Sequence, residues 1–253
     1  MFDLHGRTAL VTGAGQGVGA GIAELLAAQG ALVAVNDLDA ARADATVKHI
    51  RDAGHQARAL VFDVTDPESV ADAVRSFAHD AAPVDILVNN AGNAGAGAFR
   101  PRPFRETEPH EWRRFTEVNL FGVMNCAKAV LDGMADRRHG RIITIASGSG
   151  VVGQAIGVSL YAAAKGGAIA FMRHLAMETA ADGITANTIA LGMIDPAASG
   201  RVADHTRELA KRIPVGRIGL PDDAGALCAY LASDQAAWIT GQTLHLNGGS
   251  YTS

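Results

Sequence analysis

The fold is decided by residues 8–37, which read TALVTGAGQGVGAGIAELLAAQGALVAVND. Thr8–Thr12 is a short apolar run of the kind that forms buried strands, and Ala20–Gln29 has the apolar periodicity of a helix. Ala31–Asn36 is a second apolar run and is followed at once by Asp37. The stretch therefore predicts a strand, a glycine-rich turn, a helix and a second strand that lies parallel to the first.

The same alternation continues to the end of the chain. Further strands are expected at 57–62, 84–88, 142–146, 183–190 and 243–246, and helices at 40–53, 111–138 and 221–231. Another helix follows Asp66, which is expected to cap it ahead of Pro67. Strands that alternate with helices predict an α/β fold, in which a doubly wound parallel sheet of about seven strands has helices on both faces.

No linker or repeat interrupts this pattern, so residues 1–253 are expected to form a single domain. Ligands of such a domain are expected at the carboxyl ends of the strands. Residues 93–110, rich in glycine, proline and arginine, are expected to form a loop. The least regular region, 193–213, is interpreted as a mobile helical lid near the ligand edge.

The composition argues against several classes of protein. A net charge of −4 gives no basic footprint for nucleic acid or an anionic membrane. Two cysteines cannot make a disulfide scaffold, and the histidines lack metal-ligand spacing. The first residues lack a signal-peptide layout, and no apolar run is long enough to span a bilayer. We expect a cytoplasmic protein without a metal, membrane or nucleic-acid partner.

Four glycines, Gly13, Gly15, Gly17 and Gly19, follow the first strand and open the helix. Glycines let backbone amides approach a pyrophosphate, and a helix N-terminus supplies partial positive charge. The pattern is TGxxxGxG, in which Val18 stands at the third glycine of the generic GxGxxG fingerprint. The alternative is a glycine-rich turn without a ligand.

Asp37 ends the second strand about twenty residues after the glycines. A carboxylate there can accept hydrogen bonds from an adenosine ribose and would repel a 2′-phosphate. No arginine occurs in residues 38–41, and Gln16 rather than a basic residue precedes Gly17. This pattern favours NAD(H) over NADP(H). The alternative is that Asp37 merely caps the next helix.

Tyr161 and Lys165 are four residues apart in an alanine-rich segment, which places both on one helix face. A nearby ammonium favours phenolate over phenol and would lower the tyrosine pKa. A serine from the loop after the preceding strand can hold a carbonyl or carbinol oxygen beside the phenol. These groups suit proton transfer in alcohol and ketone chemistry. The alternative is an ordinary pair on a helix surface.

Five motifs in this order resemble the short-chain dehydrogenase/reductase family: TGAGQGVG at 12–19, NNAG at 89–92, Val118-Asn119, Ser147 and Tyr161-AAA-Lys165. The closing segment LASDQAAWITGQTLHLNGG at 231–249 is also similar, so the resemblance covers about Gly6 to Gly249. It implies a Rossmann-like, nicotinamide-dependent oxidoreductase that assembles as a homotetramer. The general layout is similar to the 3-oxoacyl-carrier-protein reductase branch.

The resemblance also implies roles for single residues. Tyr161 would be the general acid/base, and Lys165 would lower its pKa and hold the nicotinamide ribose. Ser147 would position the substrate oxygen, and Asn119 would hold a water at a bend in the long helix. The expected cofactor-binding residues are Gly13, Gly15, Gln16, Gly17, Val18, Gly19, Asp37, Leu38, Asp63, Val64, Asn90, Ala91, Gly92, Tyr161, Lys165, Gly192 and Ile194. Those expected to line the substrate pocket are Ser149, Val151, Gln154, Ile156, Met193 and Ile194.

Three departures from the family pattern bear on the site. The family's serine-to-tyrosine interval of thirteen lies between those from Ser147 (fourteen) and Ser149 (twelve). We choose Ser147, because Gly150 then keeps its register and the extra residue falls in the loop 154–160. Leu191 replaces the family's proline. Pro196 replaces a threonine that would contact the nicotinamide amide.

The sequence thus predicts an NAD(H)-dependent oxidoreductase that interconverts a medium-sized secondary alcohol, cyclic or acyl-linked, and its ketone. Two alternatives stay open. One is a 3-oxoacyl-thioester reductase that uses NADPH. The other is a sensor or scaffold that binds the cofactor without turnover.

Overall fold

The computed structural model describes residues 2–92, 101–195 and 208–252. The strands in this part of the chain are β1 (Thr8–Val11), β2 (Leu32–Val35), β3 (Ala57–Ala59), β4 (Ile86–Asn89), β5 (Gly140–Ser147), β6 (Ile184–Leu191) and β7 (Thr243–Leu246). They form one sheet in the order β3-β2-β1-β4-β5-β6-β7, and every neighbouring pair is parallel. The predicted seven-stranded, Rossmann-like sheet is confirmed, and its strand order reverses between β1 and β4.

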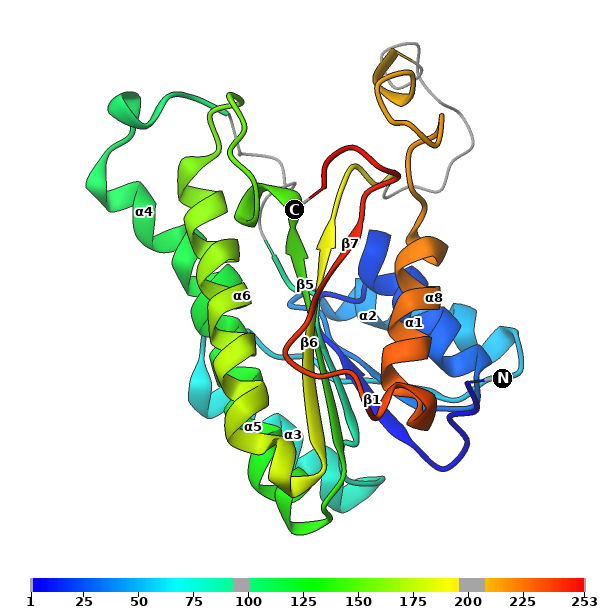
Figure 1. Ribbon diagram of the computed structural model, residues 1–253. Helices are drawn as coiled ribbons and strands as arrows, with labels where there is room; N and C mark the ends of the chain where they lie inside the picture. Colours follow the sequence, from blue (N-terminus) through cyan, green and yellow to red (C-terminus); the bar gives the residue numbers. More distant parts are fainter. Residues whose placement is uncertain (1, 93–100, 196–207, 253) are drawn as a thin grey trace.

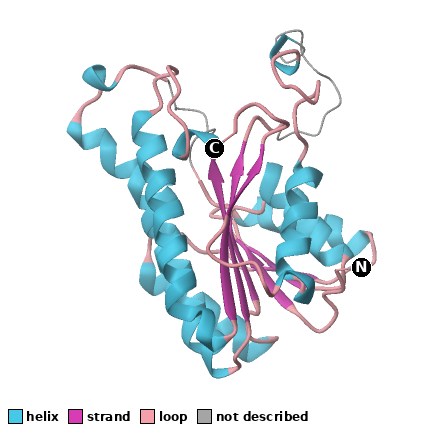
Figure 2. Ribbon diagram, in the orientation of Figure 1, coloured by secondary structure: helices cyan, strands magenta, loops and turns pink. Residues whose placement is uncertain are grey.

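Helices cover both faces of this sheet (Figures 1 and 2). The described α-helices are α1 (Gly17–Ala28), α2 (Ala40–Asp52), α3 (Pro67–Asp80), α4 (Pro109–Thr116), α5 (Gly122–Asp136), α6 (Ser159–Thr179) and α8 (Pro221–Ala232). The short turns are η1 (Phe104–Glu106), the π-helical η2 (Glu117–Phe121), η3 (Gly148–Gly150), η4 (Ala180–Asp182) and η5 (Asp234–Ala236). Helices α3, α5 and α6 pack on one face, and α1, α2 and α8 on the other (Figure 1).

The two faces of the sheet have separate apolar cores. Side chains alternate between the faces along a strand, so Val11 packs with the α1 side and its neighbour Leu10 with the α5 side. Val88 and Leu87 in β4 divide in the same way. A strand buried on both faces has no polar side, which is why these strands read as continuous apolar runs in the sequence.

Most elements begin or end one to three residues from their predicted bounds, and two elements show the cause of the difference. Strand β3 ends at Ala59 and not at 62, because the Asn36 side chain donates hydrogen bonds to the carbonyls of Leu60 and Phe62, both at 3.0 Å. The long helix predicted at 111–138 begins at Pro109 and is divided by the π-helical turn η2. The bend expected at Asn119 lies in this turn.

The helix is interrupted where a side chain competes with the backbone. Asn119 Nδ2 donates to the Phe115 carbonyl at 3.0 Å, and this carbonyl would accept from the Asn119 backbone in a regular helix. The expected cap of α3 is confirmed, since Asp66 accepts from the backbone amides of Glu68 and Ser69 with Pro67 in the first turn.

Most of the lid interpreted at 193–213 lies outside the described residues, which omit 196–207. Its described ends are anchored: Ile194 forms a parallel bridge with Gly219, and Ile213 is buried. The lid therefore stays a prediction. Within the part of the chain that the structure describes, no helix has the length and apolar character needed to cross a membrane.

Candidate active site

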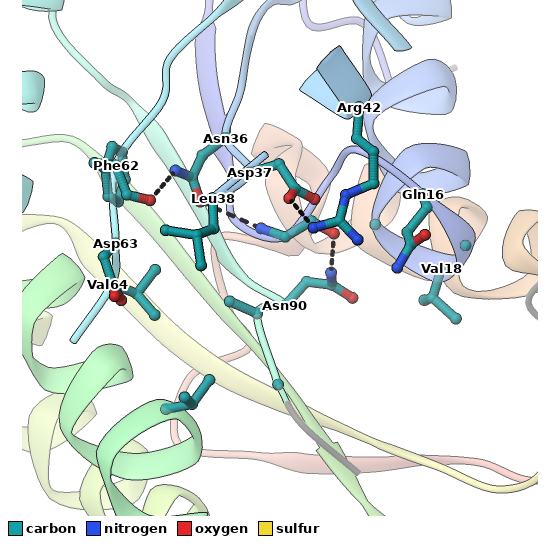
Figure 3. A pocket seen from close by; sticks show the side chains of 16 residues that line it. Gln16, Val18, Asn36, Asp37, Leu38, Arg42, Phe62, Asp63, Val64 and Asn90 are labelled. Carbon is teal, nitrogen blue, oxygen red and sulfur yellow. Dashed lines mark hydrogen bonds and ion pairs between the residues drawn. The ribbon is translucent and has the colours of Figure 1, made fainter. Parts of the chain in front are cut away.

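A cavity of about 800 Å³ opens at the carboxyl ends of β1, β2 and β4, where the strand order reverses (Figure 3). Its lining includes twelve of the expected cofactor residues: Gly13, Gln16, Gly17, Val18, Gly19, Asp37, Leu38, Asp63, Val64, Asn90, Ala91 and Gly92. Four lining residues were not expected, namely Asn36, Arg42, Phe62 and Val118. Crevices of doubly wound sheets bind ligands at this position.

The glycine loop is shaped to admit a phosphate group. Gly13 and Gly17 have positive φ angles of 61° and 59°, and a Cβ on Gly19 would overlap the Gly13 carbonyl and the Asn90 amide. Gln16 precedes α1 without a side-chain capping bond, and the first turn of α1 holds no acidic residue. The free amides at this helix N-terminus suit a pyrophosphate.

The NNAG segment is tied to the glycine loop by a compact set of hydrogen bonds. Thr12 Oγ1 accepts from the backbone amides of Asn90 and Ala91, both at 3.0 Å. Asn90 Nδ2 in turn donates to the carbonyls of Thr12 at 2.9 Å and Gly13 at 3.0 Å. These bonds fix the end of β4 against the end of β1, which holds the cavity open between them.

Asp37 is 6% exposed and faces the cavity from the end of β2 (Figure 3). Its Oδ2 accepts from the Gly15 amide at 3.2 Å, and its Oδ1 accepts from the Asp39 amide at 3.0 Å. Asp39, not Asp37, caps α2, since it accepts from the amides of Ala41 and Arg42. The structure therefore rejects the alternative that Asp37 serves only as a helix cap.

Arg42 was not expected at the site, because it lies one residue beyond the stretch 38–41, which has no arginine. The first turn of α2 brings its guanidinium to the cavity, where Nη2 lies 3.0 Å from Asp37 Oδ1 (Figure 3). The Arg42 side chain is 43% exposed, and its Nε also lies 3.6 Å from Asp39 Oδ2, so two carboxylates hold it at the cavity edge. Its position in the sequence could have indicated this. Arg42 is three residues after Asp39, the N-cap of α2, and residues three apart lie on the same side of a helix.

Asp63 and Val64 form the opposite wall of the cavity. Asp63 Oδ1 accepts from the amide and hydroxyl of Thr65, both at 2.8 Å. Val64 is buried against Gly122 of α5, where any Cβ would lie 2.9 Å from Val64 Cγ2. Asn125 Nδ2 also donates to the Val64 carbonyl at 2.9 Å. The expected cofactor-binding residues Asp63 and Val64 are thus held firmly on the cavity edge.

Ser147 and Tyr161 meet at the carboxyl end of β5. A hydrogen bond joins their side chains, and Ser147 Oγ also accepts from the Ser149 amide at 3.2 Å. Ser149 turns elsewhere, because its hydroxyl donates to Gln154 Oε1 at 3.0 Å. Of the two candidate serines, the structure therefore brings Ser147 to the tyrosine.

Lys165 is buried one helical turn from Tyr161. Its Nζ donates to the Ile145 carbonyl at 2.8 Å and lies 6.0 Å from the centroid of the Tyr161 ring. Burial lowers the pKa of Lys165 to about 8. A Cβ at Gly92 would lie 2.9 Å from Asn119 Oδ1 and 3.4 Å from Lys165 Nζ, so these groups adjoin.

The expected lowering of the Tyr161 pKa by Lys165 is not found. Burial raises the pKa of the Tyr161 phenol, and the hydrogen bond with Ser147 opposes that shift in part. The ammonium of Lys165 donates to a backbone carbonyl and lies over the ring of Tyr161.

The expected residues that follow β6 lie away from the large cavity. Met193 and Ile194 line a second cavity of about 150 Å³ with Leu246 and Asn247. The Gly192 amide donates to the Leu246 carbonyl at 2.9 Å, and Ile156 is 53% exposed. Pro196 lies outside the described residues. Within those residues, no cluster of three or more His, Cys, Asp or Glu side chains could hold a metal ion.

Comparison with known proteins finds similarity over almost the whole chain. A family model described as Enoyl-(Acyl carrier protein) reductase matches residues 13–251. The 3-oxoacyl-(acyl-carrier-protein) reductase of Escherichia coli (strain K12) is 41% identical over 251 residues, 99% of each chain. The cis-4-hydroxycyclohexanecarboxylate dehydrogenase of Sinomonas cyclohexanicum is 41% identical over 244 residues, 96% of each chain.

A solved structure has a similar fold over almost the whole chain. The gluconate 5-dehydrogenase of Burkholderia cenocepacia J2315, in complex with NADP and tartrate, superposes with a TM-score of 0.89. It is 36% identical and covers 98% of this chain and 96% of its own. The relatives are similar to this chain in sequence over almost their whole length, and the solved structure is also similar in fold.

Proposed function

Because this chain belongs to the short-chain dehydrogenase/reductase family and is an oxidoreductase built to bind a nicotinamide dinucleotide, we propose that it interconverts a secondary alcohol and a ketone with NAD(H). The observation that carries the proposal is the hydrogen-bonded pair of Ser147 and Tyr161, with buried Lys165 one turn away. The dehydrogenase relatives named above make alcohol oxidation a reasonable direction for this site.

The proposed chemistry assigns each polar group one task. The bound nicotinamide supplies a hydride to the ketone or accepts one from the alcohol. Ser147 and Tyr161 hold the substrate oxygen between their hydroxyls, and Tyr161 gives that oxygen a proton in reduction or takes it in oxidation. Lys165 keeps a cation beside the phenol, and Asn119 adjoins Lys165 on the side of the π-helical turn.

Asp37 supports NAD(H) as the cofactor. Its buried carboxylate lies at the cavity wall beside Gly15, where it can accept from ribose hydroxyls but repels a phosphate dianion. The next residue, Leu38, is 68% exposed and offers no charge to a 2′-phosphate. The glycine loop and the Asp37 carboxylate are thus both consistent with NAD(H) as the cofactor.

A second candidate is an NADPH-dependent 3-oxoacyl-thioester reductase. Arg42 favours it, because a guanidinium that leaves Asp37 can pair with a 2′-phosphate at the same cavity edge. The identity of 41% to the Escherichia coli reductase supports the same reading. The non-catalytic alternative is weakened by the presence of Asn119, Ser147, Tyr161 and Lys165 together.

The test is a fluorescence titration of the purified protein with NADH and with NADPH, followed by turnover assays with both. The panel contains cyclic hydroxycarboxylates, open-chain sugar acids, simple secondary alcohols with their ketones, and a 3-oxoacyl thioester. Tighter NADH binding with turnover of an alcohol supports the proposal. Tighter NADPH binding with turnover of the thioester alone establishes the second candidate. Binding without any turnover would leave a cofactor-binding sensor or scaffold.

A homotetramer and a cytoplasmic location stay predictions. Size-exclusion chromatography with light scattering tests the first, since a 26.1 kDa chain would elute as a particle of about four times that mass.

A further inference from the structure

The last residues of the chain lie against the candidate active site. Ser147 pairs with Leu191 across β5 and β6, and Leu191 pairs with Leu246 across β6 and β7. The three strands therefore end at one level, and the segment 246–251, here called the C-terminal tail, begins beside the catalytic serine loop. The C-terminus lies next to the carboxyl ends of β5 and β6 (Figure 1).

The ring of Tyr251 fills the space that a side chain at Gly148 would need. A Cβ on Gly148 would overlap the Tyr251 ring and hydroxyl. On the other side of the same turn, a Cβ on Gly150 would lie 2.9 Å from the Gly166 amide of α6. The turn that follows Ser147 is therefore clamped between Tyr251 and the helix that carries Tyr161.

Tyr251 is itself held in place by its neighbours. Asn247 Nδ2 donates to the Tyr251 carbonyl at 2.9 Å, and the His245 ring meets the Tyr251 ring edge-on at a centroid distance of 5.2 Å. The hydroxyl makes a hydrogen bond with the Asn247 side chain and a longer contact of 3.5 Å to the Ala190 carbonyl. The edge of the ring and the hydroxyl both lie close to the serine turn, and the ring supplies most of the contacting atoms.

The tail also contacts the other loop at this edge. A Cβ on Gly192 would lie 2.7 Å from Asn247 Cα, and the Gly192 amide donates to Leu246. The Val215 amide donates to the Gly248 carbonyl at 3.0 Å, two residues after the end of the interpreted lid. One short segment thus touches the serine turn, the loop after β6 and the base of the lid region.

We propose that Tyr251 is a positioning residue for the reaction, whose ring fixes the turn that carries Ser147 against α6. The inference rests on the proposed function, because it presupposes that the Ser147 hydroxyl acts on the substrate oxygen. A small displacement of that hydroxyl would misplace the substrate oxygen relative to Tyr161. Displacements of about 1 Å can lower a rate by about 100-fold.

The test compares Tyr251→Leu, which removes the ring, with Tyr251→Phe, which keeps it. Trp238→Leu, at a 99% exposed aromatic residue, is the matched control. Tyr251→Leu should lower kcat about 10- to 100-fold with an unchanged Kd for NADH. Tyr251→Phe and the control should retain most of the activity. Full activity of Tyr251→Leu, or an equal loss in Tyr251→Phe, would overturn the proposal.

A double-mutant cycle separates positioning from general stability. In a Ser147→Ala background, Tyr251→Leu should lower the remaining kcat less than about twofold, because the group that it positions is already gone. An undiminished loss in that background would show that Tyr251 acts through the fold and would overturn the proposal.

Hydrogen exchange of the peptide containing residues 147–152 gives a readout that needs no turnover. Exchange there should be faster in Tyr251→Leu than in wild type and Tyr251→Phe, and equal exchange in all three contradicts the clamp. If wild type shows no turnover with any substrate, the proposed function fails on its own account. The exchange result then still decides whether Tyr251 holds the turn.

Discussion

Tyr161 is the residue on which the proposed proton transfer depends, and its substitution gives the first prediction. Tyr161→Phe removes one oxygen from a side chain hydrogen-bonded to Ser147, and leaves the cavity lining unchanged. We expect kcat to fall by about 10²- to 10⁴-fold, the range for loss of a general acid/base, with the Kd for NADH unchanged. Steady-state kinetics and fluorescence titration measure the two values. Retained turnover would show that another group transfers the proton.

The pH dependence of the two directions follows from the protonation state that each requires. Oxidation needs Tyr161 as phenolate and reduction needs it as phenol, while burial raises the pKa of this phenol. The deprotonated fraction grows as pH rises toward that pKa. We therefore expect alcohol oxidation to accelerate from about pH 6 to 9, and ketone reduction to show no such rise. Oxidation that slows over this range would contradict Tyr161 as the base.

Asp37 and Arg42 make opposite demands on the cofactor. Asp37→Asn removes the charge that repels a 2′-phosphate, so NADPH should bind more tightly and NADH less tightly. Arg42→Ala removes the only described cation in the cavity lining and should weaken NADPH binding alone. A charge-assisted hydrogen bond contributes about 1.5 kcal/mol, or roughly tenfold in Kd. Unchanged discrimination in Asp37→Asn would show that another group selects the cofactor.

Some site residues could be predicted because their spacing from a strand end identifies them, whereas others are defined only by contacts between distant elements. The glycines, Asp37 and Tyr161 stand at fixed distances from predicted strand ends, so spacing was enough to place them. Asn36 and Arg42 act through contacts across two elements, and their residue types carry no distinguishing mark. Tyr251 is further removed still, because only the shared level of three strand ends brings it to Ser147.

At the scale of elements, the turn into α1 depends on close backbone approach. In Gly19→Ala the new methyl group would overlap the Gly13 carbonyl and the Asn90 amide, so the loop must shift. Overpacking of this kind destabilises by about 1–3 kcal/mol, and we expect NADH binding to be lost with it. Thermal unfolding and NADH titration measure both effects.

A glycine elsewhere in a helix provides the control for that substitution. Gly133→Ala in α5 meets only the end of the flexible Arg137 side chain, and alanine favours a helix interior. It should leave NADH binding unchanged and stability equal or slightly higher. Normal NADH binding by Gly19→Ala would show that the loop tolerates a side chain.

Element types were predicted well, and the errors lie where a side chain replaces a backbone partner. Strand β3 is short because Asn36 takes over two carbonyls, and the long helix is divided where Asn119 takes over the Phe115 carbonyl. Nothing in the sequence marks Asn36 for this role, whereas the family resemblance placed Asn119 at a bend in the long helix. Periodicity reports which face of an element is buried, but not which hydrogen bonds its ends will exchange.

At the scale of the whole molecule, the alternation of strands and helices was enough for the sheet, because right-handed crossovers leave few orders for parallel strands. The crevice where the order reverses follows from that topology. The distribution of the candidate site over two cavities does not follow from it. The two cavities depend on how the loops after β5, β6 and β7 pack together. No single stretch of sequence specifies this packing, because the three loops are far apart in the chain.

The large cavity joins both halves of the molecule, which gives the last prediction. Its lining comes from the ends of β1, β2 and β4 and from Val118 in the π-helical turn before α5, so a ligand there contacts elements on both faces of the sheet. Binding to the folded state alone at 100 times Kd adds about 2.7 kcal/mol to the free energy of unfolding. For a chain of this length that corresponds to a rise in Tm of about 5–10 °C.

Differential scanning fluorimetry should show this rise with NADH, a smaller one with equimolar NADPH, and none with NADH in Gly19→Ala. Equal rises with the two cofactors would mean that Asp37 and Arg42 offset each other and that the chain accepts both.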